Sequence, residues 1–169
     1  MSSARRGSPH CMTDETIHAT TTIAAPVEAV FAVLTDPAKH AAVDGTGWVR
    51  GALDAAPLSG PGQIFRMAMY HPNHPDGTYT VANRVATFEP PRAISWEPGP
   101  DVEDDGEPQP GGWVWRYDLA PAGPSGTEVT LTYDWSAVSA HVRGYISFPP
   151  FPVEHLVDSL HHLAELTTD

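Results

Sequence analysis

The chain has 169 residues, of which 41% are hydrophobic and 18% are charged, a composition typical of one globular domain. Nine basic residues against 21 acidic ones give a formal net charge of −12. This charge argues against nucleic acid as a partner, because phosphate backbones are bound by basic patches. The single cysteine, Cys11, excludes an internal disulfide framework and a multi-cysteine metal site. No apolar run is long enough for membrane insertion or a secretory signal, so we expect a cytoplasmic protein.

The first part of the chain predicts a leader, a strand and two short helices. Residues 1–14 are polar and without periodicity, so we expect a disordered leader followed by one domain over residues 15–169. Residues 17–23 predict a strand because they are rich in threonine and β-branched residues. Apolar residues at helical spacing after a proline predict a helix over 26–34, and an Asp-Pro pair begins a second, short helix over 36–43.

The middle of the chain predicts antiparallel strands. Between residues 48 and 135, apolar residues alternate with polar ones, which is typical of strands that bury one face. The clearest runs are at residues 63–70, 78–88, 93–97, 113–119 and 129–135. An acidic, proline-bounded stretch over residues 98–112 predicts a solvated loop.

The last part of the chain predicts two helices separated by prolines. An amphipathic pattern covers residues 138–146, and an apolar stripe over four turns covers residues 153–167. About six antiparallel strands followed by a long helix indicate an α+β fold, in which a curved sheet wraps around the C-terminal helix.

Four stretches carry a resemblance to a known family. They are TTIAAPVEAVFAVLTDPAKHAAVDGTG at 20–47, NRVATFEPPRAISWEPG at 83–99, WVWRYDLAPAGPSGTEVTLTYDW at 113–135 and VEHLVDSLHHLAEL at 153–166. With these stretches the chain resembles the START / Bet v 1-like superfamily, also called SRPBCC or polyketide cyclase/dehydratase-like. The resemblance implies a helix-grip fold with a cavity between sheet and C-terminal helix. Members bind lipids, sterols, polyketides or other hydrophobic molecules there, and some catalyse cyclisation or dehydration.

The strand alternation places a set of large side chains on the sheet face that the resemblance makes the cavity side. Aromatic and methionine side chains suit an apolar ligand, although each of them is also a normal core residue. The predicted ligand-binding residues are Trp48, Phe65, Met67, Met69, Trp96, Trp115, Tyr117, Tyr133 and Trp135. They imply a small hydrophobic or aromatic molecule as the partner.

Polar candidates for catalysis are few. Asp44, in an Asp-Gly turn, could orient His40 for proton transfer, or it could accept backbone hydrogen bonds in its own turn. His71 lies in a loop that could touch a ligand at the cavity mouth. Arg84, within a strand, could hold a ligand oxygen or cover the outer sheet face, whereas alternation places Arg66 outside.

We expect no metal and no other cofactor. His71 and His74 lie in a loop with Asp76, which is weak metal-ligand spacing. His155 and His162 fall opposite the apolar stripe of the last helix and are predicted to be solvated. The motifs of hydrolases, dinucleotide-binding proteins and P-loop proteins are absent from the sequence.

Three functions remain open at this point. The first is binding of a lipid-, sterol- or polyketide-like molecule in the cavity. The second is an enzyme of the cyclase/dehydratase type, with Asp44, His71 or Arg84 as its polar group. The third is a protein-interaction module like a chaperone activator, which should have a filled interior and a large exposed apolar patch. The sequence leaves the ligand and the oligomeric state undetermined.

Overall fold

The fold is built on one antiparallel sheet, seen in a computed structural model that describes residues 10–12, 15–44, 48–53, 56–70, 77–100, 111–144 and 147–168. The sheet has eight strands in the order β1-β2-β8-β7-β6-β5-β4-β3. The strands are β1 (His10–Met12), β2 (Thr16–Ile23), β3 (Val49–Ala52), β4 (Ile64–Tyr70), β5 (Thr78–Glu89), β6 (Ala93–Pro100), β7 (Val114–Ala122) and β8 (Gly126–Asp134). This arrangement confirms the α+β helix-grip prediction.

The sheet buries one face, as the alternation predicts. In β8, Val129, Leu131 and Tyr133 are buried, and their partners across β2 include the buried Ile17 and Ala19. Register shifts interrupt the pairing of β5 with β6 and of β3 with β4. Such irregularities increase the local bend of a strand, which helps a sheet to curl around a helix.

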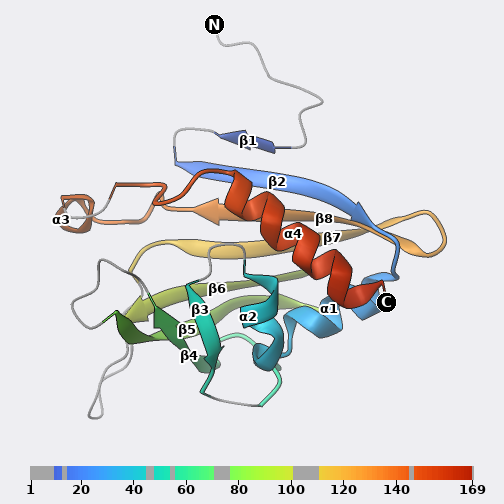
Figure 1. Cartoon of the computed structure of the whole chain (residues 1–169), viewed down its shortest axis with the longest axis horizontal. Coiled ribbons are helices and arrows are strands. Elements are labelled where there is room, and N and C mark those ends of the chain that lie inside the picture. The colour runs from blue at the N-terminus through green and yellow to red at the C-terminus, as the bar shows by residue number, and fades with distance from the viewer. Residues whose placement is uncertain are drawn as a thin grey trace, which may run out of the picture.

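The long helix α4 (Glu154–Thr167) supplies the other half of the core. Figure 1 shows it lying across the face of the sheet, with α1 (Val27–Leu34) and α2 (His40–Val43) beside its C-terminal half. Its apolar stripe is buried, since Leu156 and Leu163 are 0% exposed and Leu160 is 1% exposed. Burial of such a stripe, rather than helix propensity, stabilises helices in proteins.

The short helices between β2 and β3 begin as the sequence predicts. Asp36 caps the 3₁₀ turn η1 (Pro37–Lys39) by accepting a 3.1 Å hydrogen bond from the backbone N–H of Ala38. This turn leads directly into α2, which brings His40 and Val43 into the interior.

Three segments differ from the sequence-based expectation. His10–Met12, within the leader expected to be disordered, forms β1 and pairs with β2. Strand β6 continues to Pro100, because residues 98–100 pair with β5 instead of starting a loop. The predicted helix over 138–146 is reduced to one turn, α3 (Ala140–Arg143), which has no buried residue. Residues 145 and 146, which the amphipathic pattern needs, lie outside the described part of the chain.

Within the described residues, no helix is long and apolar enough to cross a membrane.

Candidate ligand-binding cavity

A cavity of about 780 Å³ lies between the sheet, α2 and the N-terminal end of α4. It contains seven of the predicted ligand-binding residues: Trp48, Met67, Met69, Trp96, Trp115, Tyr117 and Tyr133. These side chains come from the segment before β3 and from β4, β6, β7 and β8. Predicted side chains from five segments therefore surround one space.

Two of the predicted residues do not line the cavity. Phe65 is 1% exposed, and the rings of His40 and Trp96 pack edge-on against it at 5.5 and 5.7 Å. Trp135 follows the end of β8, where the chain turns through a hydrogen bond from Val138 N–H to the Trp135 carbonyl. Both residues are buried core side chains. The prediction included them because alternation identifies the face of the sheet on which a side chain lies, but not whether that side chain reaches the cavity.

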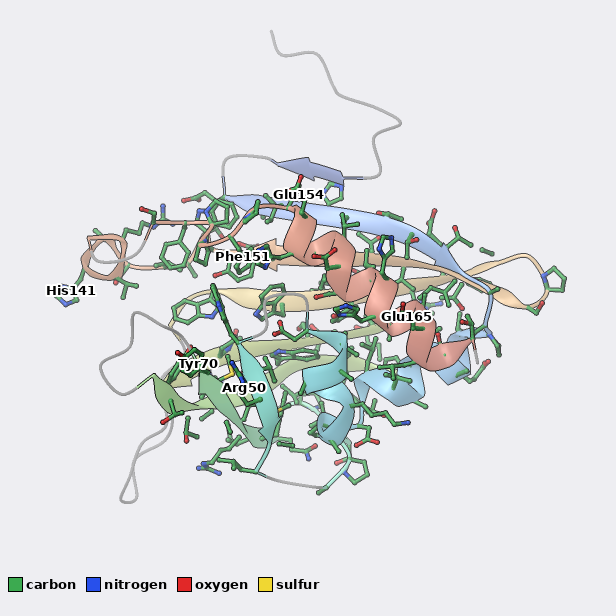
Figure 2. The ribbon with its side chains drawn as sticks, in the orientation of Figure 1. Arg50, Tyr70, His141, Phe151, Glu154 and Glu165 are labelled. Atoms are coloured by element: carbon green, nitrogen blue, oxygen red, sulfur yellow. The ribbon has the colours of Figure 1, made fainter. Side chains whose placement is uncertain are left out.

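Phe151, which the sequence analysis did not select, connects the cavity wall to α4. Its ring stacks on Trp115 at 5.5 Å and lies 4.9 Å from Tyr133 and 5.8 Å from Trp48. Figure 2 shows Phe151 beside the N-terminal end of α4, directed toward the sheet. It belongs to the Ser147–Phe151 segment that closes this side of the cavity. A phenylalanine between prolines is part of no periodic pattern, so only the tertiary structure identifies Phe151 as a cavity residue.

Of the polar residues that the sequence analysis selected as candidates, some line the cavity and others do not. Asp44 lines the cavity, and its Oδ2 accepts a 3.2 Å hydrogen bond from the backbone N–H of Val49. Arg84 is outside the cavity, because it pairs with Glu97 on the neighbouring strand at 3.2 Å and both side chains are partly exposed. Arg66 is likewise absent from the cavity lining. His71, like His74 and Asp76, lies outside the described residues.

His40 is the buried histidine of the cavity wall. Its ring stacks on Trp96 with centroids 4.9 Å apart, and its Nε2 is 2.8 Å from the carbonyl oxygen of Leu34. A carbonyl oxygen only accepts hydrogen bonds, so Nε2 carries the ring hydrogen and donates the hydrogen bond. Burial lowers the pKa of His40 below its ordinary value of 6.5, although Leu34 and the charge of Asp36 act in the opposite direction. Asp44 instead accepts its hydrogen bond from the backbone N–H of Val49, as the turn interpretation of this residue predicts.

The lowered pKa of His40 predicts that acid destabilises the fold. Below pH 6.5 the unfolded chain binds a proton at this ring and the folded chain does not, so stability falls as pH decreases toward the folded pKa. One proton contributes a slope of at most about 1.4 kcal/mol per pH unit. We expect His40→Gln to remove this component, measured by urea unfolding from about pH 7.5 to about pH 5. An unchanged slope in the variant would assign the acid sensitivity to other groups.

Two buried tyrosines line the same space. Burial raises the pKa of Tyr117, with the charge of Asp44 adding to the effect, and burial alone raises the pKa of Tyr133. Both side chains therefore remain protonated at neutral pH, so their hydroxyls are available as donors or acceptors.

Two histidines of α4 differ from the prediction that they are solvated. His162 Nδ1 lies 3.3 and 3.2 Å from the carbonyl oxygens of Val43 and Asp44, which attaches α4 to the end of α2. His155 stacks on Phe151 at 5.6 Å, and its Nδ1 is sealed without a hydrogen-bond partner. In the described part of the chain, no three potential metal ligands form a group.

Comparison with known proteins places the chain in a family. A sequence profile of the family described as "Polyketide cyclase / dehydrase and lipid transport" matches residues 14–152. The chain belongs to this family. The match supports the resemblance to the START / Bet v 1-like superfamily, to which the helix-grip fold also points.

Curated relatives match the chain over part of their length. Uncharacterized protein Rv0088 of Mycobacterium tuberculosis is 30% identical over 122 residues, which cover 72% of this chain and 48% of that protein. The chain thus spans about half the length of the curated relatives it matches.

Solved structures of other proteins share the fold. Protein CV1439 of Chromobacterium violaceum superposes with a TM-score of 0.64 at 20% identity, covering 93% of this chain and 99% of that one. The Zhui aromatase/cyclase of a Streptomyces species superposes with a TM-score of 0.61 at 18% identity, covering 90% and 93%. At these identities the likeness establishes the fold alone.

Proposed function

We propose that this protein binds a small hydrophobic or aromatic molecule in the cavity between the sheet and α4. The observation that carries the proposal is the cavity itself, about 780 Å³ and lined mainly by aromatic and other apolar side chains. Pockets for small molecules usually have about 300–1,000 Å³ and an apolar lining with few polar groups. The family description, which includes lipid transport and polyketide chemistry, agrees with such a ligand.

Apolar burial is the main source of affinity for this binding. Each Å² of apolar surface removed from water contributes about 25 cal/mol, so a few hundred Å² contribute several kcal/mol. Association costs consume part of this gain, and micromolar binding needs a net free energy of about −8 kcal/mol, so contacts with the aromatic rings have to contribute as well. The rings of Trp115, Tyr133 and Phe151 offer a preformed surface for a planar ligand.

Replacing a cavity ring should weaken this binding. We expect Trp115→Ala or Tyr133→Ala to reduce the affinity for a naphthalene-based dye by about tenfold, or ~1.4 kcal/mol, because a large aromatic contact is lost. Titrations followed by tryptophan and dye fluorescence provide the measurement. Trp135→Phe is the control, since this buried tryptophan does not line the cavity. A failure of the wild type to bind any of several dyes, fatty acids and aromatic compounds would contradict the proposal.

An enzyme of the cyclase/dehydratase type is the second candidate. It is favoured by the polar groups that line the apolar space, among them His40, Asp44 and Tyr79. General acid–base chemistry needs such groups within reach of a bound substrate. Incubation with a short β-polyketone thioester, followed by liquid chromatography and mass spectrometry, tests this candidate. Cyclisation conserves the mass but changes the retention time, and dehydration removes the mass of one water molecule, so identical chromatograms and masses with and without protein would leave binding alone.

A protein-interaction module receives less support. Its interior should be filled, whereas this interior contains the cavity. Among the residues that the structure describes, the exposed large hydrophobic side chains are Leu53, Tyr70 and Leu166, which are single residues on separate segments. Figure 2 shows Tyr70 beside Arg50, whose guanidinium lies 4.8 Å from the centre of the tyrosine ring and partly covers it.

A further inference from the structure

Three buried polar side chains lie in the part of the cavity wall that contains Trp96. His40 stacks on it at 4.9 Å, and the ring of Tyr117 lies 5.9 Å from it. Asn83 is paired across the sheet with Phe65, whose ring is 5.7 Å from that of Trp96. His40, Asn83 and Tyr117 are between 4% and 8% exposed, and all three line the cavity. We call this group the Trp96 cluster.

Most polar side-chain atoms of the Trp96 cluster have no hydrogen-bond partner among the described residues. Nε2 of His40 donates to Leu34, but Nδ1 of His40 has no hydrogen-bond partner in the described part of the chain. The same holds for the side chains of Asn83 and Tyr117. Among the described side chains, only Nδ1 of His155 is both sealed and unpartnered. The cluster atoms are therefore accessible, and for residues this deeply buried the accessible space is the cavity.

The tautomer of His40 decides what Nδ1 does. Because the proton is held on Nε2 by the Leu34 carbonyl, Nδ1 of the neutral ring carries a lone pair and accepts hydrogen bonds. Burial lowers the pKa of His40, so the ring stays neutral at neutral pH. An apolar wall with a fixed acceptor favours a ligand with a donor at that point, because a buried acceptor left unpaired costs free energy.

We infer that the ligand of this cavity is an apolar, ring-sized molecule with a hydroxyl group that donates a hydrogen bond to Nδ1 of His40. Asn83 and Tyr117 provide further polar contacts for the oxygen of that hydroxyl, beside the flat surface of Trp96. This inference rests on the proposed binding function and specifies its ligand class. The rest of the cavity, with Trp115 and Phe151, holds the apolar part of the molecule.

The test compares two compounds of similar shape, 2-naphthol and 2-methoxynaphthalene, of which only the first donates a hydrogen bond. Affinities are measured by calorimetry for the wild type and for His40→Gln. The glutamine amide has an N–H that can replace Nε2 as the donor to the Leu34 carbonyl, and the substitution removes the Nδ1 acceptor. We expect the variant to bind 2-naphthol about fivefold more weakly, the usual worth of one neutral hydrogen bond, and to bind 2-methoxynaphthalene within twofold of the wild type.

A matched control and a spectroscopic measurement separate the possible outcomes. His18→Gln makes the same replacement on β2, on the face opposite the buried Ile17 and Ala19, and should change neither affinity. The ¹⁵N spectrum of the imidazoles should show a neutral Nε2–H ring at His40, with a shift of Nδ1 when 2-naphthol binds. If His40→Gln weakens both compounds equally, or the proton is on Nδ1, the inference is wrong while the binding function stands. If neither compound nor any dye binds the wild type, both fail together.

Discussion

Leu160→Ala is expected to lower the free energy of unfolding by about 2–5 kcal/mol, the cost of removing a buried leucine and leaving a cavity. Leu160 is 1% exposed and lies in the middle of the buried stripe of α4, between Leu156 and Leu163. Helix α4 packs against both β2 and β8. Because the sheet holds these neighbours in place, we expect them to leave most of the space of the missing leucine side chain empty. Urea denaturation followed by circular dichroism measures the change.

A matched control lies on the same helix. Leu166 is 38% exposed, so Leu166→Ala should change the free energy of unfolding by no more than about 0.5 kcal/mol. The pair removes the same atoms from one helix and differs in burial alone. Equal effects of the two substitutions would mean that α4 does not present this stripe to the sheet.

The sequence predicts this fold well where local and tertiary signals agree. Val129, Leu131 and Tyr133 alternate along β8, and the buried face of the sheet preserves that period. The same agreement defines α4, whose apolar residues recur at helical spacing. The sequence-based prediction fails where a neighbouring strand decides the local secondary structure. Residues 98–100 have the composition of a loop, and they form a strand because β5 supplies hydrogen bonds to them.

The cavity is predictable in part for the same reason. Alternation identifies the correct sheet face for Trp115 and Met67, and on β5 it would also have directed Asn83 inward and Arg84 outward. It does not identify Phe151, which reaches the cavity from the segment before α4. His40 shows the limit most clearly, because its significance depends on a carbonyl six residues away and on the indole of Trp96, which lies far along the chain.

Phe65 separates the core from the cavity wall. Its ring is 1% exposed and supports both His40 and Trp96, yet it does not line the cavity. Phe65→Ala should therefore lower the free energy of unfolding by about 3–5 kcal/mol, as for other buried phenylalanines. Chemical denaturation measures this loss, and a change below about 1 kcal/mol would contradict the placement of Phe65 in the core.

A milder substitution tests the same distinction in a folded protein. Phe65→Leu keeps an apolar side chain beneath His40 and Trp96, so we expect a stability loss of about 1 kcal/mol and a dye affinity within about twofold of the wild type. Trp115→Ala, in the cavity wall, should reduce dye affinity more than Phe65→Leu does. If Phe65→Leu weakens dye binding as much as Trp115→Ala, the ligand reaches below the Trp96 ring, and Phe65 belongs to the binding site as the strand alternation first indicates.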